Sequence, residues 1–326
     1  MFNIGVALIG TSGIAARHVA SLQKIPHVTL RWIVSRDLAR AERFAQKLGI
    51  QKGTNRLELA LDDPSVHVVM IFTEPMRHVN LALLALQAGK DLLIEKPLDV
   101  DPVKGELLLE AALGSNQVIG IVSPYRFEPA LIEMKQRLDS EARDLPKLAS
   151  LRCLWPRNQH YYEQGNGWRM DYSPFFLNQG IHWLDALNGL FGSPLRVCAT
   201  SRVTRPFLRC ADMSAALIDY PGEVTAVVSG GSFGTTKEPD HFSVVYPGGM
   251  LDFQKLKGSP PPNTLREHMA RLILRQPVGN HPVTDTAFLV CKDFINAVRT
   301  RGQPGATLAD GWKALRLAHQ ISHLNT

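Results

Sequence analysis

Cysteine is scarce in this sequence. Only four cysteines occur in 326 residues, without CxxC spacing and without clustered histidines: Cys153, Cys198, Cys210 and Cys291. This pattern indicates neither a zinc site nor a disulfide framework, so we expect no bound metal. The simplest expectation is that all four thiols are reduced and buried.

Long hydrophobic runs are missing as well. The sequence contains no stretch of about eighteen apolar residues, the length that a membrane-spanning helix needs. Its N-terminus lacks a basic region followed by an apolar stretch and a small-residue cleavage site. We therefore expect a cytoplasmic protein with no membrane partner.

Charge of one sign is not concentrated anywhere. The 36 Lys and Arg residues exceed the 30 Asp and Glu residues, for a net charge of +6, but they are scattered among acids. This indicates mild attraction for phosphate-bearing ligands and no nucleic-acid partner. A chain of this length, 45% hydrophobic and 20% charged, can form two ordinary domains.

The most informative segment is the first. An apolar run at residues 4–9 meets the loop GTSGIA and then a helical pattern, which is the arrangement that binds a dinucleotide pyrophosphate. Gly10 occupies the first glycine position, Ser12 replaces the second glycine, and Ala15 occupies the third. The alternative is a strand-to-helix turn without a ligand. The predicted phosphate loop comprises Gly10, Thr11, Ser12, Gly13 and Ile14.

The end of the next expected strand bears on the choice of cofactor. Residues 28–34 read as a strand, and residues 37–50 as a helix ending at Gly49. Where an NAD site would place an acidic residue, the chain has Ser35 and Arg36, with Arg40 one turn later. Serine and arginine can receive a 2′-phosphate, so we expect NADP(H), with NAD(H) as the alternative. The arginines could also be ordinary solvated residues.

Strands and helices continue to alternate through residue 122. Residues 66–72, 91–95 and 117–122 read as strands, with helices at 78–89 and 102–113 between them. This predicts an α/β fold with a doubly wound parallel sheet, whose ligands collect at the carboxyl ends of the strands. The residues at those ends are Thr73, Glu74, Pro75 and His78, and then Glu95, Lys96 and Pro97.

Beyond about residue 123 the pattern changes. Short strands separated by turns are expected within residues 148–155, 195–203, 213–220, 224–233 and 241–246, and SPPPN at 259–263 predicts a loop. This is typical of a mostly antiparallel open sheet with helices on one side. We expect a dinucleotide-binding Rossmann domain at 1–123 and an α+β domain at 124–326 for substrate binding and oligomerisation.

Several motifs now combine in one order. GTSGIAARH, SRDLARAERFA, TEPMRHV and AGKDLLIEKPL are followed by YRFEP, WRM, LNQGIHWLD and DGWKALRLAHQIS. Across essentially its whole length the chain resembles the Gfo/Idh/MocA family, the glucose–fructose oxidoreductase and inositol dehydrogenase group of nicotinamide-dependent sugar and polyol dehydrogenases. The resemblance implies a homodimer or homotetramer formed through the C-terminal sheet.

The resemblance also implies roles for individual residues. Lys96 matches the lysine beside the nicotinamide and the reacting hydroxyl, and His182 matches the acid/base histidine. Oxidation of an alcohol requires a proton acceptor, and a nearby ammonium stabilises the developing alkoxide. The resemblance places Trp168 and Arg169 near the cofactor, together with the strand-end residues above. The expected substrate-binding residues are Lys96, Arg126, Tyr161, Asn178, His182 and Asp185.

The sequence departs from the family pattern at three places. Asn178 stands where aspartate is common, Glu74 stands where proline usually follows the threonine, and bulky residues 172–176 replace a glycine-rich turn. Tyr172, Phe175 and Phe176 therefore predict a reshaped substrate pocket. The aromatic and basic segment 155–169 could stack on a sugar ring or pack under the sheet.

Two functions remain open at this point. The first is an NADP(H)-dependent oxidoreductase acting on a secondary hydroxyl or carbonyl of a sugar, polyol or sugar derivative. The second is a catalytically silent regulator that binds NADP(H) or a sugar. Retention of Lys96 and His182 favours the enzyme, and Asn178 favours the regulator.

Overall fold

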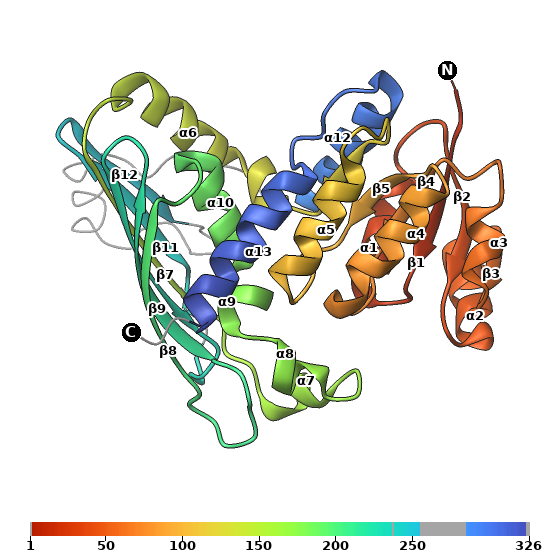
Figure 1. Ribbon diagram of the computed structural model, residues 1–326, viewed down its shortest axis with the longest axis horizontal. Helices are drawn as coiled ribbons and strands as arrows, with labels where there is room; N and C mark the ends of the chain where they lie inside the picture. The colour runs from red at the N-terminus through yellow and green to blue at the C-terminus, as the bar shows by residue number, and fades with distance from the viewer. Residues whose placement is uncertain (1, 237, 255–284, 324–326) are drawn as a thin grey trace, which may run out of the picture. The chain divides into compact units, whose positions relative to one another are not determined.

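The structure is a computed structural model that describes residues 2–236, 238–254 and 285–323. The expected loop at 259–263 lies outside these residues. The chain forms two compact units (Figure 1). The first comprises Met1–Pro124 and Asp285–Leu315, and the second comprises Tyr125–Thr284 and Arg316–Thr326. Residues 285–315 thus return to the first unit.

The first unit contains a six-stranded parallel sheet in the order β3-β2-β1-β4-β5-β6. The predicted doubly wound parallel sheet is confirmed. Its strand order reverses direction between β1 and β4, where such sheets bind ligands. The strands are β1 (Ile4–Ile9), β2 (Val28–Val34), β3 (Lys52–Thr54), β4 (Val68–Ile71), β5 (Asp91–Ile94) and β6 (Ile119–Ile121).

Helices connect these strands. They are α1 (Gly13–Leu22), α2 (Leu38–Leu48), α3 (Leu57–Leu61), η1 (Pro75–Arg77), α4 (His78–Gln87) and α5 (Pro102–Ala112). Asp37 caps the start of α2 by accepting from the Arg40 N–H, and Gly49 ends it in the left-handed conformation, φ 65°. The predicted end of this helix is therefore confirmed. The short elements β3 and α3 were not assigned from the sequence.

Residues 285–315 complete the first unit with α12 (Thr286–Thr300) and the beginning of α13 (Leu308–His323). Cys291 on α12 lies 3.2 Å from Nδ1 of His18 on α1. Thr307 forms a β-bridge with Gly120 of β6. Trp312 donates from Nε1 to the Pro102 carbonyl at 3.2 Å. The core of this unit therefore depends on residues distant in the sequence.

The second unit contains a six-stranded sheet in the order β12-β11-β7-β10-β9-β8. β7 and β10 are parallel and the other neighbours are antiparallel, as the sequence predicts for a mostly antiparallel sheet. The strands are β7 (Lys147–Leu154), β8 (Arg196–Arg202), β9 (Met213–Tyr220), β10 (Val224–Gly231), β11 (His241–Tyr246) and β12 (Gly249–Gln254). Its helical elements include η2 (Pro124–Phe127), α6 (Pro129–Glu141), α7 (Gln159–Glu163), α8 (Trp168–Tyr172), α9 (Phe175–Asn178) and α10 (Ile181–Phe191).

The two faces of this sheet differ. On the inner face, Trp183 of α10 packs against Phe242 and Phe253 at ring distances of 5.4 and 5.3 Å. Alternate strand positions expose apolar side chains on the outer face: Leu148, Leu217, Val227, Val245 and Met250. Cys198 on β8 is also exposed, so the expectation that all four cysteines are buried is wrong for this residue. Strand alternation places it outward.

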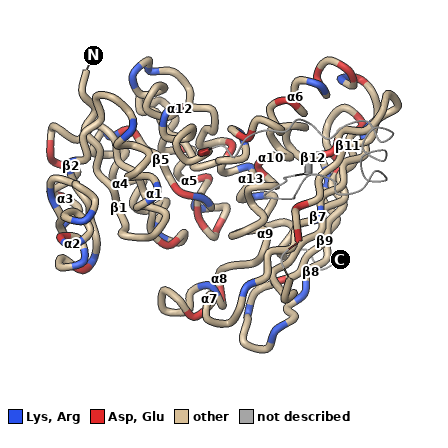
Figure 2. Tube along the Cα trace, turned by 180° about the vertical axis from the view of Figure 1, so that it is seen from behind, with Lys and Arg blue, Asp and Glu red and all other residues tan. Residues whose placement is uncertain are grey.

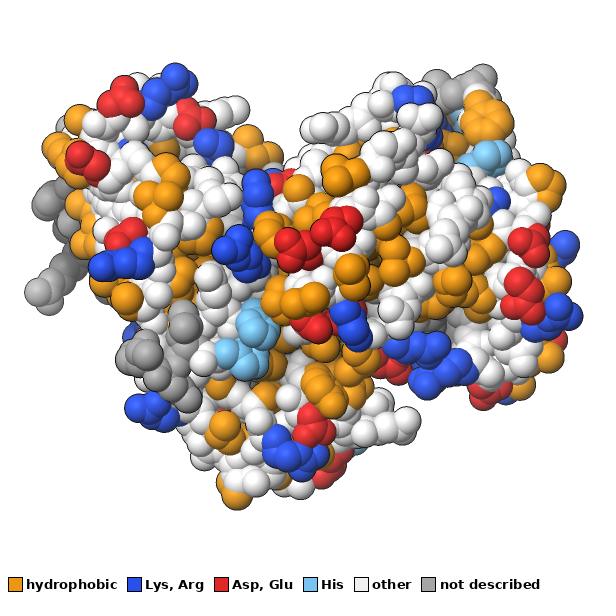
Figure 3. Space-filling model, in the orientation of Figure 1, with side chains coloured by type: hydrophobic (Ala, Val, Ile, Leu, Met, Phe, Trp, Pro, Cys, Tyr) orange, Lys and Arg blue, Asp and Glu red, His pale blue; other side chains and the backbone are white. Residues whose placement is uncertain are grey.

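Charges are interspersed along the described helices. Figure 2 shows basic and acidic positions following one another on α2 and α6. Figure 3 shows hydrophobic side chains at the surface over α4 and α5, where Leu84, Val103, Leu107 and Leu113 are exposed. Within residues 2–236, 238–254 and 285–323, no helix has the length and hydrophobicity to span a bilayer. No cluster of three or more potential metal-ligating His, Cys, Asp or Glu residues occurs there either.

Candidate active site

The loop after β1 is shaped around Gly10. Its φ of +107° is unfavourable for other residues, and a Cβ there would lie 2.6 Å from the Phe72 carbonyl oxygen. Gly13 has open space instead, because a Cβ at that position would meet no atom within 4 Å. The loop therefore passes tightly over the end of β4 and then opens at the start of α1.

Ser12 joins this loop to the helix. Its hydroxyl accepts from the Ala15 N–H at 3.2 Å and donates to the Phe72 carbonyl at 3.3 Å. Ser12 thus caps α1. The N–H groups of Gly13 and Ile14 lie in the first turn, where the helix itself offers them no carbonyl acceptor. Gly13 and Ile14 are exposed. Exposed donors at a helix N-terminus suit a phosphate group, so the loop fits a dinucleotide.

The arginines beyond β2 lie close to this loop. Arg36 donates from Nη2 to Oε1 of Glu74 at 3.1 Å, and Arg40 donates to the Thr11 carbonyl at 3.0 Å. Arg36 is 70% exposed and Glu74 29% exposed, so their ion pair is weak and can yield to a ligand. The Ser35 N–H is taken by the Thr54 carbonyl. The structure therefore places Arg36, Arg40 and Glu74 around the phosphate loop.

His78 links the loops after β4 and β5. Its Nδ1 lies 2.8 Å from the Pro97 carbonyl oxygen, and its Nε2 lies 3.0 Å from the Thr73 carbonyl oxygen. The side chain is buried, and burial lowers the pKa of its imidazole. His78 therefore lies between the two loops, and its neutral ring can donate its one N–H to either carbonyl.

Lys96 begins the loop after β5. The preceding Glu95 is buried and its carboxylate accepts from the Lys96 N–H; burial raises the pKa of this carboxyl. The Lys96–Pro97 peptide bond is cis. Lys96 itself is partly exposed, and Pro75 and Pro97 are buried beneath the two loops. The first unit thus gathers most of the predicted cofactor residues at the carboxyl end of its sheet.

In the second unit, His182 lies in the first turn of α10. Asp185 lies on the same helix as His182, whereas Asn178 does not, because α9 ends at Asn178 and α10 begins at Ile181. The His182 ring stacks on Tyr125, with centroids 5.4 Å apart at 27°, and lies 6.5 Å from Trp155. The imidazole is partly exposed on an aromatic surface.

Asp185 and Arg126 bind each other. Nε of Arg126 donates to both Asp185 oxygens, at 3.1 and 2.9 Å, and Nη2 donates to Oδ1 at 2.9 Å. The side chains are only 17% and 4% exposed. This bidentate pair fixes η2 against α10, so two residues expected to bind substrate share a structural contact.

Tyr161 is held between two arginines. The guanidinium carbons of Arg157 and Arg169 lie 5.0 and 4.9 Å from its ring centre, and Arg169 also lies 4.6 Å from the Trp168 ring. Asn178 donates from Nδ2 to the Tyr161 hydroxyl at 3.0 Å and to the Ser173 hydroxyl at 2.5 Å. Tyr161 and Asn178 are partly exposed, whereas the neighbouring Tyr162 is buried. The aromatic segment therefore contributes Tyr161 to the surface and Tyr162 to the core.

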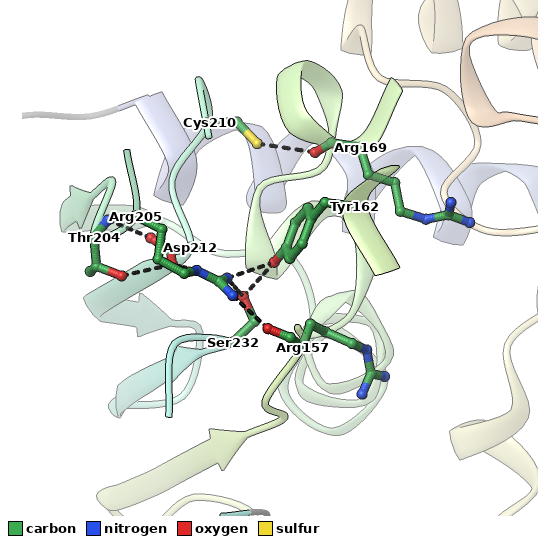
Figure 4. Close-up of polar contacts among 8 residues, drawn as sticks. All are labelled: Arg157, Tyr162, Arg169, Thr204, Arg205, Cys210, Asp212 and Ser232. Carbon is green, nitrogen blue, oxygen red and sulfur yellow. Dashed lines mark hydrogen bonds and ion pairs between the residues drawn. The ribbon is translucent and has the colours of Figure 1, made fainter. Parts of the chain in front are cut away.

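An arginine network that the sequence did not predict anchors this segment (Figure 4). Arg205 pairs with Asp212 at 2.8 Å and donates to the Arg157 carbonyl, the Tyr162 hydroxyl and the Ser232 hydroxyl at 2.5, 3.0 and 2.9 Å. The guanidinium groups of Arg157 and Arg169 point away from this network. Nothing in the local sequence around Arg205 indicates these distant partners.

The expected pocket residues behave differently from one another. Phe175 and Phe176 are 1% and 0% exposed, so they are core residues and cannot line an open pocket. A Cβ on Gly180 would collide with both rings, and one on Gly230 would collide with the Phe175 ring. Tyr172 is 53% exposed. The prediction of a reshaped pocket is therefore wrong for the two phenylalanines, because tertiary packing turns them inward.

Sequence profiles identify the family. Residues 4–122 match the oxidoreductase family with an NAD-binding Rossmann fold named for Gfo, Idh and MocA, and residues 131–252 match the Gfo/Idh/MocA C-terminal domain. Together these matches cover most of the chain. The chain belongs to the Gfo/Idh/MocA family. The resemblance stated from the motifs is confirmed.

Curated members of the family are distant relatives. The trans-1,2-dihydrobenzene-1,2-diol dehydrogenase of Mus musculus is 29% identical over 234 residues, covering 69% of this chain and 66% of the mouse protein. The enzyme of the same name from Oryctolagus cuniculus is 30% identical over 216 residues, covering 65% of this chain and 64% of the rabbit protein. The chain thus spans slightly less than two thirds of these relatives.

Several solved structures share the fold along almost the whole chain. Levoglucosan dehydrogenase in complex with NADH and levoglucosan superposes with a TM-score of 0.83 at 19% identity, covering 98% of this chain and 96% of that one. Scyllo-inositol dehydrogenase from Lactobacillus casei, with NAD(H) and scyllo-inositol, gives a TM-score of 0.79 at 19% identity and the same coverage.

Proposed function

We propose that this protein is an NADP(H)-dependent oxidoreductase that transfers a hydride to or from a secondary hydroxyl or carbonyl of a sugar, polyol or sugar derivative. The observation that carries the proposal is the loop over β4, where only glycine fits at position 10 and Ser12 caps α1. Membership of a family of oxidoreductases supports it. The first unit would bind the dinucleotide, and the second would bind substrate.

The residues that would hold the cofactor lie at one end of the parallel sheet. The N–H groups of Gly13 and Ile14 would bind the pyrophosphate, with Gly10, Thr11 and Ser12 shaping the loop. The nicotinamide side would be formed by strand-end residues of the first unit: Thr73, Glu74, Pro75, His78, Glu95 and Lys96. Trp168 and Arg169 are the further residues that the resemblance to the family assigns to the cofactor. The bound nicotinamide supplies the hydride donor or acceptor.

Arg36 and Arg40 support a preference for NADP(H). Both lie beside the phosphate loop, and no carboxylate follows β2 directly to bind ribose hydroxyls. A 2′-phosphate would compete with Glu74 for the exposed Arg36 guanidinium and add charge-assisted hydrogen bonds. NAD(H) is named in the neighbouring structures. NAD(H) is therefore the alternative that the selectivity experiment must test.

The proton would move through side chains of this chain. His182, partly exposed on the aromatic surface of the second unit, would accept the hydroxyl proton during oxidation and return it during reduction. The Lys96 ammonium would stabilise the developing negative charge on the substrate oxygen. Neither role requires Asp185, whose carboxylate already binds Arg126 through three hydrogen bonds.

Substrate hydroxyls would be bound next to His182. Tyr161 and Asn178 are partly exposed and already joined by a hydrogen bond, so together they offer donors and acceptors to a polyol. Arg126 and Asp185 would contribute by holding α10 in place. The names of the relatives, which include a dihydrodiol, an anhydrosugar and an inositol dehydrogenase, support a cyclic polyhydroxylated substrate.

A homodimer or homotetramer would form through the sheet of the second unit. Leu148, Val245 and Met250 lie in one cross-strand row of its outer face, and Leu217 and Val227 lie in the next. All five are exposed. Burial of exposed apolar side chains is a usual reason for association.

One feature favours a catalytically silent regulator as second candidate. Asn178 replaces the family's common aspartate, and its amide nitrogen donates to two hydroxyl groups, those of Tyr161 and Ser173. An amide cannot take a proton or balance an imidazolium charge. A chain serving only as a sensor would bind cofactor without turnover.

The test is a screen of the purified protein with NADP⁺ and NAD⁺ against sugars, inositols and dihydrodiols. We expect turnover that falls by about 10²–10⁴-fold in Lys96→Ala and in His182→Ala, with cofactor affinity retained in the histidine variant. Lys47→Ala and His160→Ala, at exposed positions, serve as controls. Tight cofactor binding without turnover of any substrate would contradict the enzyme and favour the regulator.

A further inference from the structure

Asp240 is a buried carboxylate that accepts hydrogen bonds from three aromatic side chains. Oδ1 accepts from the Trp155 indole at 2.6 Å, and Oδ2 accepts from the Trp183 indole at 3.0 Å. The Tyr125 hydroxyl also hydrogen-bonds to this carboxylate. Asp240 is only 8% exposed. Three donors compensate the cost of burying its charge.

These three aromatic residues surround the candidate acid/base. His182 stacks on Tyr125 at 5.4 Å and lies 6.5 Å from Trp155, while Tyr125 meets Trp183 edge to face at 4.9 Å. Trp183 is the residue after His182 and is fully buried. The carboxylate therefore fixes the rings of Tyr125 and Trp155, which contact the imidazole. Through Trp183 it also fixes the helical turn that carries His182.

Each donor comes from a different part of the second unit. Tyr125 belongs to η2, Trp155 follows β7, and Trp183 lies on α10, while Asp240 directly precedes β11. Without this carboxylate, two indole N–H groups and a phenol would lose an acceptor, and the Trp183 N–H would lose it in a buried place. Rings that lose such a bond shift toward other partners, and the surface under His182 would shift with them.

We propose that Asp240 is a positioning residue for His182, acting through Tyr125, Trp155 and Trp183 to hold the imidazole in its working orientation. This inference rests on the proposed function, because the orientation matters for catalysis only if His182 transfers a proton. A displacement of about 1 Å at such a group can cost about a hundredfold in rate.

The decisive variant is Asp240→Asn. Its amide has one oxygen, which can serve one indole, and its NH₂ group then faces the other indole N–H. We expect kcat to fall by about tenfold to a hundredfold while the dissociation constant for the cofactor, whose proposed contacts include neither Asp240 nor its aromatic partners, stays unchanged. Glu238→Gln is the matched control, since Glu238 lies two residues away and pairs with the exposed Arg152.

Trp155→Phe provides a rescue that a merely structural role would not show. Phenylalanine keeps a ring beside His182 but removes the N–H that opposes the NH₂ group introduced by Asp240→Asn. We expect the double variant, Asp240→Asn with Trp155→Phe, to recover part of the kcat lost in Asp240→Asn, giving a clear coupling in the double-mutant cycle. Additive losses in kcat would overturn the proposal.

NMR of the histidine ring separates this proposal from the proposed function. The ring signals of His182 are assigned by their loss in His182→Gln. Their chemical shifts depend on ring currents from Tyr125 and Trp155, whether or not the protein has catalytic activity. We expect them to move in Asp240→Asn and to stay in place in Glu238→Gln. Unmoved signals in Asp240→Asn would overturn the positioning role. Moved signals in a chain without turnover would support the positioning and refute the enzyme.

Discussion

The two units build their candidate sites from different materials. In the first unit the site consists largely of backbone: a glycine loop, the start of α1 and the Phe72 carbonyl after β4. In the second unit it consists of side chains joined across large sequence separations, as in Arg126–Asp185 and Trp155–Asp240. Backbone sites follow from local sequence, whereas side-chain networks depend on the tertiary fold.

This difference sets where each unit is vulnerable. In a backbone site the ligand contacts are N–H groups, which nearly every residue carries. Such a site therefore loses binding only when a substitution changes the backbone conformation. A side-chain network fails when one member is removed and leaves a buried charge without its partner. The predictions below test this contrast.

Arg205→Met should have the largest effect on stability, because it leaves the buried Asp212 without its guanidinium partner. We expect the free energy of unfolding to fall by about 3–5 kcal/mol, measured by denaturant titration. Arg209→Met is the control: its pair with Asp171 is exposed, so we expect no measurable change. Equal losses for both arginines would contradict the importance of burial.

Acid should destabilise the first unit through His18. Burial lowers the pKa of this imidazole from 6.5 to about 4. Above pH 6.5 both the folded and unfolded states hold a neutral ring. As the pH falls from 6.5 to about 4, the unfolded state gains the proton first, and stability drops by about 3 kcal/mol.

The matching experiment compares unfolding free energies at pH 7 and pH 4. We expect His18→Leu to lose less stability over this interval than the unchanged chain, although its packing on Phe72 and Cys291 differs. His160→Gln, at an exposed position, should behave like the unchanged chain. An identical pH dependence in His18→Leu would show that this ring does not control the acid response.

Gly10→Ala tests the backbone site. The added methyl would meet the Phe72 carbonyl in a residue with φ of +107°, so we expect a loss of about 1–3 kcal/mol in stability and weaker cofactor binding. Gly13→Ala has open space and should keep stability. Calorimetry of unfolding and cofactor titration measure both effects. Comparable damage at both glycines would contradict the shape assigned to the loop.

Arg36→Ala should produce the smallest effect, confined to selectivity. We expect the dissociation constant for NADPH to rise about tenfold, as for loss of a charge-assisted hydrogen bond, with little change for NADH. Arg43→Ala on the exposed side of α2 is the control. Fluorescence titration with each cofactor measures the ratio. Equal weakening of both cofactors would remove the argument for NADP(H).

The sequence predicted the first unit well because its signals are local. The strands at 4–9 and 28–34 and the end of the following helix at Gly49 all follow from neighbouring residues. The positions of Gly10 and Ser12 followed from the same reasoning. The short β3 was missed, because three residues carry too little pattern.

The second unit was predicted only in outline. Alternation indicated its strands, but not that Phe175 and Phe176 turn into the core or that Cys198 faces outward. Asp240 carried no local signal, since its two indole partners are distant in sequence. Only the folded sheet brings such groups together.

The return of α12 and the start of α13 to the first unit has a consequence for biosynthesis. Four residues of the early chain find partners in residues 291–312: His18 with Cys291, Asp91 with Arg301, Pro102 with Trp312 and Gly120 with Thr307. A ribosome releases residues 1–124 long before it makes those partners. The unit that emerges first therefore cannot complete its packing until the nascent chain supplies α12 and the start of α13.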